Sequence, residues 1–168
     1  MGISHSRALT LEAHAKVNLC LAISFPPHDG YHRARSVYQE LDLHDVVRVR
    51  VEQDIAQNAL TTHTGTHVVL DCVVDGLDPY DNLVFRAIDM AEQACGLAVA
   101  PSDTTLVIEV EKRIPAGGGL GGGSSDAAAA LKAYAQLVAI DVLDERVVTV
   151  ARMLGADVAF FLRGKTAL

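Results

Sequence analysis

Residues 115–125 read Pro-Ala-Gly-Gly-Gly-Leu-Gly-Gly-Gly-Ser-Ser, and six of these eleven residues are glycine. An apolar, β-branched run precedes the stretch at residues 106–110, and a run rich in helix formers follows it at residues 126–139. The predicted order is therefore strand, glycine-rich loop and helix. Glycines permit positive φ and let a ligand approach the backbone amides, and a helix N-terminus attracts anions. The stretch predicts a phosphate-binding loop.

Two other phosphate-binding motifs and a linker explain the same residues less well. A P-loop requires a lysine before its final serine or threonine, whereas Ser124 and Ser125 follow the glycines without one. The dinucleotide fingerprint matches at Gly117, Gly119 and Gly122, but so many glycines match it almost automatically. The acidic residues about twenty positions further on do not end a strand, as that fingerprint requires. A linker is rarely flanked by a strand and a helix.

The composition predicts a globular protein and argues against a nucleic-acid partner. The chain has 168 residues, half of them apolar, and a net charge of −7, which argues against a nucleic-acid groove but not against a small nucleotide. No run reaches the ~18 apolar residues of a membrane span. Cys20, Cys72 and Cys95 are odd in number and widely spaced, so we expect buried, reduced thiols in a cytoplasmic protein. His63 and His67 are expected at the surface rather than on a metal.

Alternating polar and apolar residues predict most of the sheet. Residues 8–15 and 16–24 are expected to form strands, the second with Val17 and Leu19 on one face and Lys16 and Asn18 on the other. That polar pair is either a solvated edge or a lysine aimed at a ligand. Residues 33–43 and 45–52 predict two further strands joined near residues 42–45. Residues 67–74 and 104–114 predict two more, the latter leading into the glycine loop.

Helices are predicted at residues 82–94, 126–139 and 144–154. Asp81 is expected to cap the first, and Gly96 to end it. After Gly155, residues 156–162 predict an apolar strand with Asp157 at its start. A carboxylate in that position must be solvated, capping a helix or paired with a cation.

Five motifs in order resemble a known family. The glycine loop fits Pro-x-x-x-Gly-Leu-Gly-x-Gly-Ser-Ser, the phosphate loop of the GHMP kinases, at each fixed position. The chain also contains Ala-Lys-Val-Asn-Leu at residues 15–19, Asp-Gly-Tyr-His at 29–32, Asp-Asn-Leu at 81–83 and Gly-Ala-Asp-Val at 155–158. Together they resemble the 4-diphosphocytidyl-2-C-methyl-D-erythritol kinases, which act in the non-mevalonate route to isoprenoid precursors.

The resemblance implies a fold, a reaction and a domain organisation. The fold is α+β, a GHMP kinase N-terminal domain of the ribosomal protein S5 domain 2-like type, with helices packed on a mixed sheet. The reaction is phosphorylation of the 2-hydroxyl of 4-diphosphocytidyl-2-C-methyl-D-erythritol, with ATP and Mg²⁺ as cofactors. Residues 1–168 would form the N-terminal ATP-binding domain, while the family's C-terminal domain is absent from this chain. Self-association through the surface left by that domain is then expected.

The resemblance also implies the site residues. Lys16 and Asp157 match the family's catalytic pair, and Asn82 lies in the motif near the adenine. Asn18, Tyr31 and His32 match positions that hold the substrate. The residues that match the ATP phosphate loop are Pro115, Ala116, Gly117, Gly118, Gly119, Leu120, Gly121, Gly122, Gly123, Ser124 and Ser125.

The sequence departs from the family pattern at two positions beside the catalytic pair. His14 stands where proline is usual before Ala-Lys, and Ala159 stands where proline is usual after Asp-Val. Two alternatives stay open: another GHMP kinase of the homoserine or mevalonate type, or a nucleotide-binding module without activity of its own.

Overall fold

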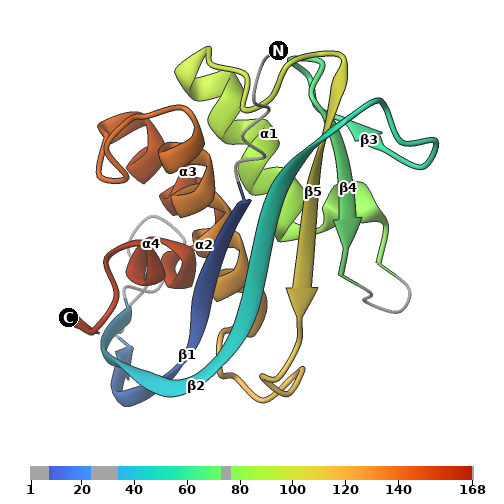
Figure 1. Ribbon diagram of the computed structural model, residues 1–168. Helices are drawn as coiled ribbons and strands as arrows, with labels where there is room; N and C mark the ends of the chain where they lie inside the picture. Colours follow the sequence, from blue (N-terminus) through green and yellow to red (C-terminus); the bar gives the residue numbers. More distant parts are fainter. Residues whose placement is uncertain (1–7, 24–33, 73–76, 168) are drawn as a thin grey trace.

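A mixed sheet forms one layer of the protein, and the helices form the other (Figure 1). The computed structural model describes residues 8–23, 34–72 and 77–167. The strand order is β1-β2-β5-β4-β3, and β6 pairs with β2 beside this path. Strands β4 and β5 are parallel, whereas the other neighbours are antiparallel. The predicted α+β class and mixed sheet are confirmed.

Two long strands, β1 and β2, form most of the sheet, and the other strands are shorter. Their bounds are β1 Ala8–Ile23, β2 Ala34–Gln53, β3 Leu60–Thr61, β4 His67–Asp71, β5 Thr104–Glu111 and β6 Thr166–Ala167. The sequence predicted breaks within β1 and β2, but each is one continuous strand. Register shifts between His14 and Lys16 and between Asn18 and Cys20 replace the expected breaks, since a bulge bends a strand without ending it.

The helices begin and end largely where capping residues place them. They are the 3₁₀ helix η1 Pro79–Asp81, then α1 Leu83–Cys95, α2 Gly122–Leu137, α3 Glu145–Leu154 and α4 Ala156–Arg163. The prediction that Asp81 caps α1 was wrong. Asn82 occupies the capping position, where its side chain accepts a hydrogen bond from the Val84 amide, and Gly96 ends the helix with φ 66° as expected.

Helix α4 replaces the strand that was predicted at residues 156–162. The apolar run is too short for its period to distinguish a strand from a helix. It begins directly after Gly155 and buries Val158, Phe160, Phe161 and Leu162 against the rest of the core. Because α4 packs on α2 and α3, the tertiary contacts favour the helix.

Helix α2 lies at the centre of the helical layer. It packs on β1 and β2 of the sheet and contacts α1 and α4 within the helical layer. Its alanines keep the backbones close, and the buried Tyr134 donates a hydrogen bond to the Leu97 carbonyl at 2.8 Å. The helix starts at Gly122, four residues before the predicted start, so Ser124 and Ser125 lie in its first turn.

Candidate active site

Lys16 and Asp157, from opposite ends of the chain, lie side by side next to the glycine loop. The Lys16 Nζ is 3.4 Å from Asp157 Oδ2, and their side chains are 8% and 31% exposed. The backbone amide of Lys16 donates to the Leu120 carbonyl at 2.9 Å, which ties β1 to the loop. Asp157 lies in the first turn of α4, where the helix dipole favours a carboxylate. The expected pair is therefore formed, against the loop.

The register shift between His14 and Lys16 explains how a lysine comes to be buried there, and a second shift follows it in β1. Two β1 residues, Asn18 and Cys20, pair with the adjacent Tyr38 and Val37 of β2, so Leu19 is the extra residue. Leu19 is 64% exposed while Lys16 is buried, which reverses the predicted apolar face of this strand. A bulge shifts the side chains that follow it, and simple alternation cannot anticipate that shift.

Besides the pairing with Asp157, a chain of hydrogen bonds holds the Lys16 ammonium. Lys16 Nζ donates to Asn18 Oδ1 at 2.6 Å, and Asn18 Nδ2 donates to Ser36 Oγ at 2.5 Å. The Ser36 hydroxyl in turn donates to the Cys20 carbonyl at 2.8 Å. The buried Ser36 was not predicted, because a lone serine within a strand carries no distinctive sequence signal.

The glycine loop ends on the N-terminus of α2. Gly117, Gly119 and Gly121 have φ of 75°, 69° and 75°, a region that favours glycine. At Gly121, a Cβ atom would lie 2.9 Å from Phe161 Cε2 and 3.2 Å from Lys16 Cε. The close approach of the loop to Lys16 therefore requires glycine at residue 121. The free amides of the first turn of α2 are then available to an anion.

A cavity of about 440 Å³ opens beside this loop. Asn82, Cys72, Leu77 and Ile114 form part of its wall, and the remaining lining includes residues 115–123. The predicted adenine-side residue and most of the predicted phosphate loop therefore face one cavity. Ligand sites in proteins commonly have volumes of this order. Lys16 and Asp157 are not part of its lining; Lys16 contacts the loop at Leu120 and Gly121, and Asp157 pairs with Lys16.

A charged triad that the sequence did not reveal lies at this cavity. Lys112 pairs with the buried Asp45 and donates to Asp126 Oδ2 at 2.7 Å, and both Lys112 and Asp126 line the cavity. Asp45 Oδ1 also accepts from the amides of Arg113 and Ile114, which connect β5 to the loop. Asp45 lies within a valine-rich strand, so its partners could be found only in three dimensions.

The two carboxylates of the triad have opposite pKa shifts. Burial opposes ionisation of Asp45, but the hydrogen bonds from Lys112 and the two amides outweigh it and lower its pKa. Burial dominates at Asp126 and raises its pKa to about 6, despite the bond from Lys112. Asp126 Oδ1 is buried and has no hydrogen-bond partner among the described residues.

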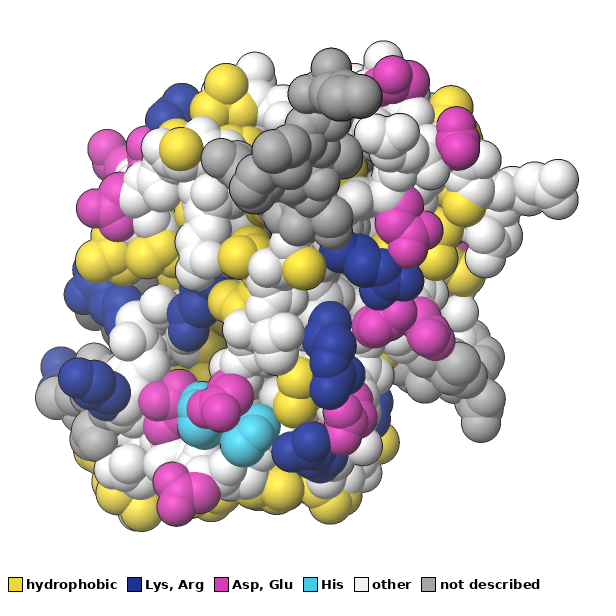
Figure 2. All heavy atoms as spheres, viewed as in Figure 1, with side chains coloured by type: hydrophobic (Ala, Val, Ile, Leu, Met, Phe, Trp, Pro, Cys, Tyr) yellow, Lys and Arg dark blue, Asp and Glu magenta, His cyan; other side chains and the backbone are white. Residues whose placement is uncertain are grey.

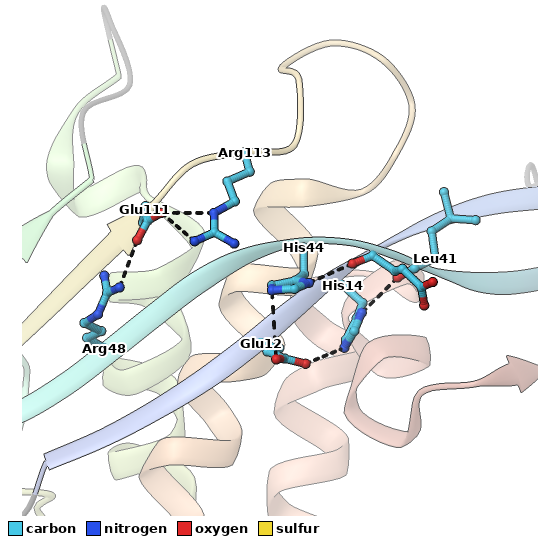
Figure 3. Close-up of polar contacts among 8 residues, drawn as sticks. Glu12, His14, Leu41, His44, Arg48, Glu111 and Arg113 are labelled. Carbon is cyan, nitrogen blue, oxygen red and sulfur yellow. Dashed lines mark hydrogen bonds and ion pairs between the residues drawn. The ribbon is translucent and has the colours of Figure 1, made fainter.

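The two departures from the family motif fit the local structure. His14 lies on the outer face of the sheet, where its Nδ1 is 2.8 Å from the Leu41 carbonyl and its Nε2 is 3.3 Å from Glu12 (Figure 3). His44 shares the same carboxylate at 3.9 Å. Ala159 lies in α4 and donates its amide to the Gly155 carbonyl at 3.2 Å, a bond that proline would lack.

The remaining predictions concern residues away from the catalytic pair. Tyr31 and His32 lie outside the described residues, so their predicted contacts stay predictions. All three cysteines are free, but Cys20 is exposed and Cys72 and Cys95 are half-buried, so the expectation of buried thiols was wrong for Cys20 and holds only in part for the other two. His63 is exposed and pairs with Asp89 at 2.8 Å.

A cluster of metal-ligating side chains and a membrane-spanning helix are both absent from the part of the chain that the structure describes. Residues 8–23, 34–72 and 77–167 contain no group of three or more His, Cys, Asp or Glu side chains placed to hold a metal. Within the same ranges, no helix combines the length and the apolar character that crossing a bilayer demands.

The fold and the glycine loop define a GHMP kinase domain. The family profile described as the GHMP kinases N terminal domain matches residues 82–165, half of the chain. The chain therefore belongs to the GHMP kinases, through their N-terminal domain.

The names of its curated relatives indicate one particular kinase within this family. The 4-diphosphocytidyl-2-C-methyl-D-erythritol kinase of Geobacter sulfurreducens is 37% identical over 163 residues, which are 96% of this chain and 53% of that protein. The enzyme of the same name from Xanthomonas oryzae pv. oryzae is 37% identical over 92% of this chain and 48% of its own length. This chain thus spans about half the length of the curated relatives it matches.

Solved structures agree with this assignment. The crystal structure of a 4-(cytidine 5'-diphospho)-2C-methyl-D-erythritol kinase matches with a TM-score of 0.66 and 36% identity, over 95% of this chain and 50% of that chain. A homoserine kinase from Cytophaga hutchinsonii matches with a TM-score of 0.57 at 20% identity, over 95% of this chain and 47% of that chain. The latter likeness shows a shared fold only.

Proposed function

We propose that this chain is the N-terminal, ATP-binding part of a kinase that phosphorylates the 2-hydroxyl of 4-diphosphocytidyl-2-C-methyl-D-erythritol. The observation that carries the proposal is the Lys16–Asp157 pair, with its two side chains 3.4 Å apart and Lys16 bonded to the glycine loop. The names of the relatives at 37% identity support the particular substrate. We expect the protein to act in the cytoplasm, where ATP is supplied.

The cavity and the loop suit ATP. Asn82 lines the cavity at the end where we place the adenine, and the glycine loop lines the end where we place the phosphates. Phosphoryl transfer depends mainly on positioning and charge neutralisation, since its transition state is loose. The α2 dipole supplies only ~0.3–2 kcal/mol, so direct amide bonds from residues 117–123 must supply more.

The oxygen-rich side chains near the loop fit Mg²⁺. Magnesium prefers hard oxygen ligands and usually takes one or two carboxylates together with phosphate oxygens. Ser124 and Ser125 carry hydroxyls in the first turn of α2, and the buried Asp126 Oδ1 has no partner among the described residues. These three side chains would hold the ion, and its charge would offset that of the β- and γ-phosphates.

Lys16 and Asp157 would act on the attacking hydroxyl. A carboxylate is far too weak a base to deprotonate an alcohol in advance. We therefore propose that Asp157 orients the hydroxyl and accepts its proton late, while Lys16 offsets charge on the transferring group. Asn18, which binds the Lys16 ammonium, and Tyr31 and His32 would hold the substrate.

The reaction can be tested with three acceptors. The chain, and the longer protein that contains it, are incubated with ATP, Mg²⁺ and either the cytidyl substrate, homoserine or mevalonate, and ADP release is measured. Preferential turnover of the cytidyl substrate supports the proposal. Preference for homoserine or mevalonate would replace it with another GHMP kinase activity. Binding of an ATP analogue without turnover by either protein would indicate a nucleotide-binding module.

Replacing Asp157 separates catalysis from nucleotide binding. In the longer protein, Asp157→Asn should lower kcat at least ~10²-fold and leave ATP affinity nearly unchanged, because Asp157 is not part of the cavity lining. Steady-state kinetics and calorimetric titration of an ATP analogue provide the two values. The exposed Asp103→Asn is a matched control. Near-normal turnover in Asp157→Asn would remove this residue from the mechanism.

A further inference from the structure

Tyr38 lies against Lys16 and against the helix that carries Asp157. It is on β2, directly opposite Asn18 of β1, at the second register shift. Its ring stacks on Phe160 of α4, with centroids 4.9 Å apart and planes 24° apart. Phe160 follows Asp157 by three residues, so the stack joins β2 to the turn of α4 that carries the carboxylate.

The face of the Tyr38 ring also lies close to the Lys16 ammonium. Lys16 Nζ is 5.4 Å from the ring centroid, within the range of a cation–π contact. The lysine side chain is nearly buried, and such contacts strengthen when the cation is desolvated. One aromatic ring thus contacts the cation of the pair and the helix that carries its anion.

The charge of Asp157 also acts on the Tyr38 phenol. Burial is the larger cause, and the charge of Asp157 the next, of a rise in the pKa of the Tyr38 phenol. Asn18 from β1 also faces the hydroxyl and acts in the opposite direction. A phenol that ionises above its usual value stays protonated at neutral pH, where it offers an O–H donor to the carboxylate.

We propose that Tyr38 is a positioning residue that holds Lys16 and Asp157 in their reactive arrangement, the ring by its contacts with Lys16 and Phe160 and the hydroxyl by an electrostatic interaction with Asp157. The inference rests on the proposed kinase function for its kinetic consequence, but the physical coupling of Tyr38 to Asp157 can be measured without turnover. It assigns a function to a residue outside the five family motifs.

The coupling is tested by ¹⁹F NMR of the chain labelled with difluorotyrosine, whose phenol titrates at a lower pH than tyrosine. The chain has four tyrosines, and the signal that disappears in Tyr38→Phe is that of residue 38. In Asp157→Asn the titration midpoint of this signal should fall, because a charge that opposes phenolate formation is gone. In the exposed Asp103→Asn it should not move. An unchanged midpoint in Asp157→Asn would overturn the proposal.

The kinetic consequence is tested in the longer protein with two substitutions. Tyr38→Phe keeps the ring and loses the hydroxyl, so kcat should fall about tenfold while the KM for ATP changes less than about threefold. Tyr38→Leu also loses the ring and should lower kcat about a hundredfold. Full kcat in both variants would refute the positioning function. If the wild-type protein has no kinase activity, the proposed function fails, whereas the ¹⁹F titration still decides whether Tyr38 and Asp157 interact.

Discussion

Gly121 is the residue at which the site tolerates substitution least. Its φ of 75° disfavours any side chain, and an added Cβ atom would lie only 2.9 Å from the Phe161 ring. We expect Gly121→Ala to destabilise the protein by about 1–3 kcal/mol and to move the loop away from Lys16. Urea unfolding measures the first effect.

Gly123 is the matched control for this substitution. It also lies in the first turn of α2, but its φ is not positive and a Cβ there would meet no atom within 4 Å. Gly123→Ala should therefore be neutral or stabilising by up to about 1 kcal/mol. Equal losses in both alanine variants would contradict the steric explanation.

Asp126 makes stability depend on pH. Its pKa of about 6 in the folded state exceeds its ordinary 3.8, so the folded state holds the proton to a higher pH than the unfolded state does. This contribution to stability is complete below about pH 4 and is lost as the pH rises through about 6. Asp126→Asn should thus raise the free energy of unfolding by about 1–3 kcal/mol at neutral pH and much less near pH 4. Urea unfolding of both proteins at about pH 4 and about pH 7, without Mg²⁺, measures the free energy of unfolding. An equal increase at both pH values would show that burial of the Asp126 charge is not the cause.

At the scale of elements, the bulged pair β1 and β2 positions the site. The shifts on either side of Lys16 and Asn18 bury the lysine, and the continuous β2 brings Ser36 and Tyr38 beside it. The outer face of β2 carries mixed charges, where its Arg48 and Arg50 pair with Glu111 and Glu109 of β5 (Figure 2). The arrangement therefore separates a binding side from a solvated side of the same strands.

Glu92 joins three elements at the far end of the helical layer. The carboxylate of this fully buried α1 residue accepts hydrogen bonds from Thr62, Thr64 and Thr66, around the β3–β4 connection, and from the Val99 amide before β5. Glu92→Gln replaces one acceptor oxygen with a donor that faces these hydroxyls or the amide. We expect a loss of about 2–4 kcal/mol in the free energy of unfolding.

Urea unfolding of Glu92→Gln against Glu145→Gln tests the expected loss. Glu145 is exposed in the first turn of α3, so its substitution should cost about 0.5 kcal/mol or less. A Glu92 variant no less stable than the Glu145 variant would show that the four bonds contribute little.

At the scale of the whole molecule, exposed apolar side chains favour association between copies of the chain. Leu19, at the bulge that follows Lys16 in β1, and Met153 of α3 are 64% and 68% exposed. We expect this chain to self-associate at high concentration through the surface near Leu19. In sedimentation velocity, Leu19→Gln should weaken association and Met153→Gln should not. A monomer at all concentrations would rule the association out.

The sequence by itself determined the strand–loop–helix unit and the family. The glycines of residues 115–125 permit the backbone conformation of the loop by themselves. Helix caps such as Gly96 and Asp144 act within a few residues of their own position, so both features can be predicted from the local sequence. Five motifs in order were enough to propose Lys16 and Asp157 as partners, although 141 positions separate them.

The tertiary structure alone decided the strand register, the form of residues 156–163 and the residues around the site. A bulge moves every later side chain to the other face, and a short apolar run becomes helix or strand according to what it packs against. The partners of Asp45, Asp126 and Tyr38 lie on other elements and leave no local pattern. Contacts between distant segments depend on packing, which periodicity does not encode.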